Sequence, residues 1–130
     1  MIVDSSAVVA MLKIQPEATA FLEAIVNAST AVMSAGGYLE TGIVIDGMRD
    51  PALSADVDRL LDELWIEIAP VTEAQARIAR QAYRDFGKGS GHKAQLNYGD
   101  CFAYALAMER GEPLLFKGED FVHAGVARAG

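Results

Sequence analysis

The sequence predicts an α/β fold with a small parallel sheet in a chain that is otherwise rich in helices. Short apolar runs of strand length alternate with longer stretches of helical periodicity, an order typical of parallel sheets. The hydrophobic fraction of 52% and only four prolines in 130 residues indicate a packed globule rather than a disordered chain. The length is that of one domain, so we expect a single domain spanning residues 1–130.

The periodicity divides the chain into four strand-like runs and six helical segments. The runs with strand character are Met1–Val3, Thr30–Met33, Trp65–Ala69 and Leu114–Phe116. The helical segments are residues 5–11, 16–26, 34–48, 51–64, 72–86 and 97–111. Residues 87–96 are expected to form a loop, in which mobility is the simplest explanation of the many glycines.

Capping residues justify the first three helical segments. Ser5 or Ser6 can cap the first, and Pro16 suits the opening of the second, which then continues with an apolar stripe. Ser34 caps the third, although Gly36 and Gly37 each cost that helix about 1 kcal/mol.

The later helices also carry start and stop signals. Pro51 opens a helix with a leucine-rich stripe, and Thr72 precedes a helix that presents small and aromatic residues inward. Asn97 starts the last helix, Gly111 suits the position just past its end, and Pro113 stops it. Trp65, beside the third strand, is expected in the core or at an interface.

Charge and cysteine content restrict the function. A net charge of −7 argues against a protein that holds nucleic acid through a broad basic surface. The stretch from Arg84 to Lys93 is nevertheless locally basic, and we expect Lys88 and Lys93 to be able to contact an RNA backbone. The single cysteine, Cys101, excludes an internal disulfide and a cysteine-based zinc site and is expected to be a buried filler.

The longest uncharged apolar stretches are Ala7–Leu12 and Cys101–Met108. They are far shorter than the ~20 residues that cross a bilayer, so no membrane association is expected. The start of the sequence also lacks a positive segment followed by a cleavable apolar one, and a cytoplasmic protein is the expectation.

Three carboxylates lie where a strand or helix could present them to a cleft. Asp4 follows the first strand, Glu40 lies on a helix face with small and apolar neighbours, and Asp100 lies near the start of the last helix. Each has an ordinary alternative: Asp4 as a helix cap, Glu40 in a salt bridge to an arginine, and Asp100 in a capping arrangement with Asn97. If the three converge, their mutual repulsion demands a cation.

The same residues resemble a known family, the PIN-domain ribonucleases, and within it the VapC toxins of type II toxin–antitoxin systems. The resemblance spans nearly the whole chain and rests on four motifs. They are Met1-Ile2-Val3-Asp4-Ser5-Ser6-Ala7, Leu39-Glu40-Thr41, Leu96-Asn97-Tyr98-Gly99-Asp100-Cys101-Phe102-Ala103-Tyr104-Ala105 and Leu114-Leu115-Phe116-Lys117-Gly118-Glu119-Asp120-Phe121. The third motif is the most specific.

The resemblance implies a single PIN domain over residues 1–130, folded as a PIN-like three-layer α/β/α sandwich with a small central parallel sheet. It implies a Mg²⁺-dependent endoribonuclease, with Mn²⁺ as a substitute, in which Asp4, Glu40 and Asp100 form the acidic core. Glu119 and Asp120 are the alternatives for the fourth acid, since Glu119 stands where the family has aspartate. Implied partners are RNA, a VapB-type antitoxin and a second copy of the chain.

The chemistry expected of these acids is hydrolysis of RNA phosphodiester bonds by metal-activated water. Asp4 and Asp100 are the main expected metal ligands, with Glu40 as ligand or water-orienting base, while Ser6 is either a cap or a partner of bound water. The main alternative is a catalytically inactive PIN-like domain that binds RNA or protein. A phosphatase with an aspartyl nucleophile is disfavoured, because such an enzyme needs a second acid at position 6, where this chain has Ser6.

Overall fold

Four short parallel strands form one sheet in the order β3-β2-β1-β4 in the computed structural model, which describes residues 1–130. The strands are β1 (Ile2–Val3), β2 (Ala31–Ser34), β3 (Ile66–Ala69) and β4 (Leu114–Leu115). The helices are α1 (Ser5–Leu12), α2 (Ala18–Asn27), α3 (Ala35–Asp46), α4 (Pro51–Glu63), α5 (Glu73–Phe86) and α6 (Asp100–Arg110). The α/β class and the small parallel sheet are therefore confirmed.

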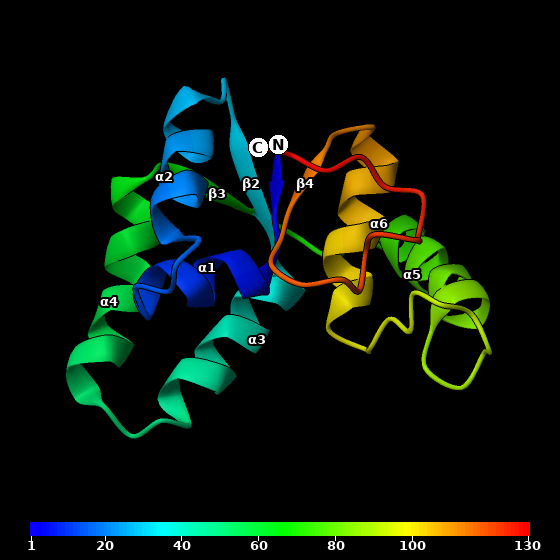
Figure 1. The fold of residues 1–130 in the computed structure, drawn as a ribbon, viewed down its shortest axis with the longest axis horizontal. Helices are drawn as coiled ribbons and strands as arrows, with labels where there is room; N and C mark the ends of the chain where they lie inside the picture. The colour runs from blue at the N-terminus through cyan, green and yellow to red at the C-terminus, as the bar shows by residue number, and fades with distance from the viewer.

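The register of the sheet sends alternate side chains to opposite faces. Ile2 pairs with Val32 and with Leu114, and all three lie in one buried cluster that includes apolar residues of α5 and α6. Val3 pairs with Leu115, and both lie in a second cluster with apolar residues of α1, α2 and α4. Helices thus cover both faces of the sheet as the outer layers of an α/β/α sandwich (Figure 1).

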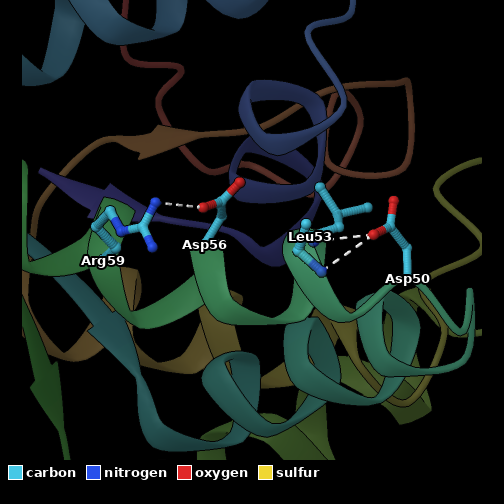
Figure 2. Close-up of polar contacts among 5 residues, drawn as sticks. Asp50, Leu53, Asp56 and Arg59 are labelled. Atoms are coloured by element: carbon cyan, nitrogen blue, oxygen red, sulfur yellow. Dashed lines mark hydrogen bonds and ion pairs between the residues drawn. The ribbon is translucent and has the colours of Figure 1, made fainter.

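Side-chain caps explain where several helices begin. The Ser34 hydroxyl accepts the Gly36 N–H at 3.2 Å, and the Thr72 hydroxyl accepts the Gln75 N–H at 3.1 Å. Figure 2 shows the start of α4, where the Asp50 carboxylate accepts backbone N–H groups, including that of Leu53 at 3.3 Å. Each cap supplies an acceptor for N–H groups that have no partner within the helix, which is typically worth about 1 kcal/mol.

Most boundaries differ from the prediction by one to three residues, and two of the differences have a clear local cause. The expected strand from Trp65 begins at Ile66, because Trp65 has a positive φ of 55°. Its side chain is 88% exposed, so the prediction of a core position is wrong. The last helix begins at Asp100 rather than Asn97, because a turn closed by reciprocal hydrogen bonds between Asn97 and Asp100 precedes it.

The predicted loop at 87–96 is closed at its base by two backbone hydrogen bonds. Lys88 donates to the Leu96 carbonyl at 2.9 Å, and Leu96 donates to the Phe86 carbonyl at 2.8 Å. These bonds fix where α5 ends relative to the start of α6, and Figure 1 shows these two helices side by side. None of the helices combines the length and apolar character needed to cross a membrane.

Candidate active site

A polar cleft opens where β1 and β4 end, at the carboxyl edge of the parallel sheet. Its walls come from the start of α1, one face of α3, the start of α6 and the segment after β4. The lining residues are Asp4, Ser5, Ser6, Val9, Gln15, Glu40, Val44, Asn97, Asp100, Lys117, Asp120 and Phe121. Four acids from four separate segments therefore share one cleft, at the edge where ligands bind in open parallel sheets.

Asp4 is buried directly after β1, with 3% of its surface exposed. Its Oδ2 accepts the backbone N–H of Ser6 at 3.0 Å, as an N-cap does, and also accepts the hydroxyl of Ser6. Burial raises the pKa of Asp4 to about 6, and the nearby negative charge of Glu40 adds to the increase. The capping role and the cleft position thus coexist, since the carboxylate both caps α1 and lines the cleft.

Glu40 reaches the cleft from α3. Its Oε1 accepts a hydrogen bond from the Ser5 hydroxyl, and no arginine pairs with it, so the salt-bridge alternative is wrong. The expected packed surroundings are only partly present, because Ile43 and Val44 on the same helix face are 65% and 42% exposed. A half-buried carboxylate held by a hydroxyl remains free to accept further bonds from a ligand or water.

Asp100 is the first residue of α6. Its side chain forms a hydrogen bond at the start of this helix and also lines the cleft. Its Oδ2 accepts the Asn97 N–H at 3.0 Å, while the Asn97 amide oxygen accepts the Asp100 N–H at 2.9 Å. This is the capping arrangement that the sequence offered as the alternative. Burial raises the pKa of Asp100 to about 7, and the negative charges of Asp4 and Asp120 contribute to the increase.

The segment after β4 presents Asp120, and not Glu119, to the cleft. Both acids are exposed, but Asp120 lines the cleft and interacts with Asp100, whereas Glu119 forms no part of the lining. The chain turns here, with Gly118 at a φ of +100°, so consecutive side chains point in different directions. The position of Glu119 therefore does not fit the direct role considered for it.

Ser6 connects two sides of the cleft. Its hydroxyl donates to Asp4 and accepts the backbone N–H of Lys117 at 3.0 Å, which ties the segment after β4 to the start of α1. The Lys117 ammonium lies 2.8 Å from Gln15 Oε1 and 3.0 Å from Glu17 Oε2. Sequence reasoning missed Lys117, Gln15 and Ser5 as cleft residues, and the only signal for Lys117 was its place within the last motif.

The donor set of the cleft suits a hard divalent cation. It consists of carboxylate, hydroxyl and amide oxygens, without cysteine sulfur or histidine nitrogen, and oxygen ligands are what Mg²⁺ and Mn²⁺ prefer. In the present arrangement, no three of the acidic side chains converge on one position that a metal ion could occupy. Mg²⁺ commonly binds through one or two carboxylates and retains several waters, so an open acidic cleft of this kind fits it. Burial is the main cause of the raised pKa values of Asp4 and Asp100, and the charges of neighbouring carboxylates add to the increase.

Comparison with known proteins places this geometry in context. The sequence model of the PIN domain matches residues 1–127. Ribonuclease VapC28 of Mycobacterium tuberculosis is 55% identical over 129 residues, which cover 99% of this chain and 97% of the relative.

Solved structures share the fold at low sequence identity. The structure of Mycobacterium tuberculosis VapC20, described as a toxin that cleaves the sarcin–ricin loop, superposes with a TM-score of 0.73 at 14% identity. That match covers 97% of this chain and 95% of the other. A toxin–antitoxin complex from Klebsiella pneumoniae matches with a TM-score of 0.68 at 15% identity over 92% and 88% of the two chains.

Proposed function

Because the chain belongs to the PIN domain family, and within it to the VapC ribonucleases, we propose that it is an endoribonuclease that hydrolyses RNA phosphodiester bonds with a divalent cation, Mg²⁺ or Mn²⁺. We propose further that it serves as the toxin of a type II toxin–antitoxin module. The premise is family membership, and the geometry of the cleft supplies the chemistry.

The observation that carries the proposal is the convergence of Asp4, Glu40, Asp100 and Asp120 on one cleft. These residues are separated by up to 116 positions in sequence, yet their carboxylates line the same hollow. Concentrating negative charge in a partly buried place costs free energy, which the raised pKa values of Asp4 and Asp100 express. Function is the simplest reason for a fold to retain such a cost.

Each residue of the cleft has a proposed role. Asp4, Asp100 and Asp120 would hold the cation, and Glu40 would act as a further ligand or orient the attacking water. When bound here, a divalent cation supplies a water of lowered pKa and neutralises charge that develops on the leaving oxygen. Lys117 is the single basic residue of the lining and can offset the charge of the substrate phosphate.

The proposal is tested with purified protein and a mixed RNA substrate, with Mg²⁺, with Mn²⁺ and with chelator. We expect cleavage only with metal, and its loss in Asp4→Asn and in Asp100→Asn. Both substitutions keep an oxygen that can accept the capping hydrogen bond, so the fold should survive, which circular dichroism checks. A folded wild-type protein that binds RNA but cuts none of it with either metal would instead favour the catalytically inactive domain.

Control and assembly are part of the same proposal. The Klebsiella pneumoniae neighbour is a toxin–antitoxin complex, which supports an antitoxin as the partner of this chain, and we propose that this antitoxin is of the VapB type. We also propose one PIN domain over residues 1–130, a homodimer and a cytoplasmic location. Co-expression with a VapB-type antitoxin, followed by co-purification and by measurement of the mass in solution, tests the partner and the dimer.

A further inference from the structure

One face of α5 carries three exposed arginines outside the acidic cleft. Arg77, Arg80 and Arg84 follow one another at spacings of three and four residues, which places them on the same side of the helix. With Gln81 they line a shallow polar hollow. We call Arg77, Arg80 and Arg84 the arginine face.

Within the protein, this face has little negative charge to balance it. Arg77 pairs with Glu73 at 3.3 Å in an exposed contact that contributes little, and Arg80 and Arg84 form no ion pair. The nearby Asp85 instead accepts hydrogen bonds from Gln81, at 3.1 Å. Like charges on adjacent turns of a helix repel each other by a few tenths of a kcal/mol, so a bound anion would reduce the repulsion among these arginines.

The charge of the chain is divided unevenly. Residues 77–93 hold five of the eleven basic residues and one of the eighteen acids, a net charge of +4, which leaves −11 for the rest of the chain. The acidic cleft alone repels a polyanion, and phosphate contacts supply most of the non-specific affinity for nucleic acid. We therefore expect an RNA substrate to gain much of its binding free energy from basic residues outside the cleft.

Surface hollows that share walls connect the cleft to the arginine face. The acidic cleft and the next hollow share Glu40 and Val44, and that hollow shares Tyr98 and Phe102 with an apolar pocket between α5 and α6. Arg80 then belongs both to this pocket and to the hollow of the arginine face. The apolar pocket in the middle of this series lies between α5 and α6, which are neighbours in Figure 1.

An exposed aromatic side chain lies midway along this route. Tyr98 is 77% exposed and meets Phe102 edge to face, with 5.1 Å between ring centroids. An aromatic ring held in this way offers a stacking surface to any unpaired base. Arginines for phosphates and an aromatic ring for a base are the two components of single-stranded RNA binding.

We propose that the arginine face binds phosphates of the single-stranded RNA that flanks the cleavage site, on a path that leaves the acidic cleft over Tyr98. This proposal rests on the ribonuclease function and adds to it a second binding region. The arginine face supplies affinity for the RNA, and the RNA is cleaved at the acidic cleft.

The test compares Arg80→Gln/Arg84→Gln with Arg49→Gln/Arg59→Gln, a control that removes the same charge from exposed arginines just before and on α4. With a long RNA, we expect the KM of the first variant to rise about tenfold with kcat unchanged, because uniform binding is lost. The slope of log Kd against log salt should fall by about 1.4, roughly 0.7 for each lost contact to a single strand. The control should match the wild type.

A short oligonucleotide that reaches only the cleft provides the decisive comparison. Wild type and Arg80→Gln/Arg84→Gln should cut it equally, a result that a merely unfolded variant cannot produce. Unchanged KM and salt slope on long RNA, with a wild type that cleaves, would overturn this inference and leave the ribonuclease function intact. If the wild-type protein neither binds nor cuts RNA, both this inference and the proposed ribonuclease function are wrong. A variant that changes the mass in solution while RNA binding is retained would show a protein contact surface instead.

Discussion

Glu40 passes directly over the backbone of Gly99: a β-carbon added to Gly99 would lie 1.5 Å from Glu40 Oε2. One turn earlier on α3, a β-carbon on Gly36 would lie 2.4 Å from Phe102 Cδ1. Two glycines, one on each side of the contact, therefore let α3 approach the start of α6. That approach brings the carboxylate of Glu40 into the cleft that holds Asp100.

Gly99→Ala should displace Glu40 and reduce cleavage at least about tenfold, since a small misplacement of a catalytic group is costly. The loss of stability should be smaller than the ~1–3 kcal/mol of core overpacking, because the atoms that collide are the end of the flexible Glu40 side chain. Gly42→Ala is the matched control, because nothing lies within 4 Å of its added β-carbon. The control should keep activity and gain about 0.5–1 kcal/mol of helix stability. Thermal melting and initial cleavage rates measure both effects.

A second variant checks that the collision is with Glu40. The shorter side chain in Gly99→Ala/Glu40→Asp should recover part of the melting temperature that Gly99→Ala loses, although activity stays low. No recovery would mean that the glycine is needed for another reason.

Without metal, Asp100→Asn should be more stable than wild type at alkaline pH. The pKa of Asp100 is raised from 3.8 to about 7 in the fold, mainly by burial, so the ionised group opposes folding. That penalty is absent below about pH 4, grows as the pH rises toward 7, and is constant above it. The variant should therefore melt a few degrees higher than wild type at about pH 8 and at nearly the same temperature at about pH 4.

Melting in chelator at both pH values makes this measurement. Asp62→Asn, an exposed acid on α4, is the matched control and should differ little from wild type at either pH. A stabilisation by Asp100→Asn that is equal at both pH values would contradict the electrostatic explanation.

Asp120→Asn should abolish metal-dependent cleavage, whereas Glu119→Gln should retain it. Only Asp120 lines the cleft and interacts with Asp100, and the two acids are adjacent, so the pair is closely matched. Stabilisation by added Mg²⁺, read as a shift in melting temperature, should follow the same pattern, because a ligand that binds the folded state stabilises it. If Glu119→Gln loses both metal-dependent cleavage and stabilisation by Mg²⁺, then Glu119 does belong to the metal site.

Ser6→Ala should weaken metal binding about 10- to 100-fold, the range seen when a group that orients a metal ligand is removed. The Ser6 hydroxyl bonds Asp4 and also accepts the Lys117 N–H at 3.0 Å, so its loss frees both the ligand and the segment that carries Asp120. Ser5→Ala removes the bond to Glu40 and should lower kcat more than metal affinity. Titration of activity with Mg²⁺ separates the two effects.

Local sequence determined the elements of this fold and the identity of its family. Strand and helix alternation, the caps at Asp4 and Ser34, the helix start at Pro51 and the C-terminal signal at Gly111 depend on neighbours within one or two turns. Such features are legible because hydrogen bonding and periodicity are local. The same reasoning proposed Asp4, Glu40 and Asp100 for one cleft.

Tertiary structure decided what local sequence left open. It presents Asp120 rather than Glu119 to the cleft, because the direction of each side chain depends on how the turn after β4 packs. It gives Asp4 and Asp100 raised pKa values, because desolvation exists only when distant segments close over a group. Helix periodicity alone puts the three arginines on one side of α5, but the packing of α5 against α6 decides that this side lies next to the pocket that includes Tyr98.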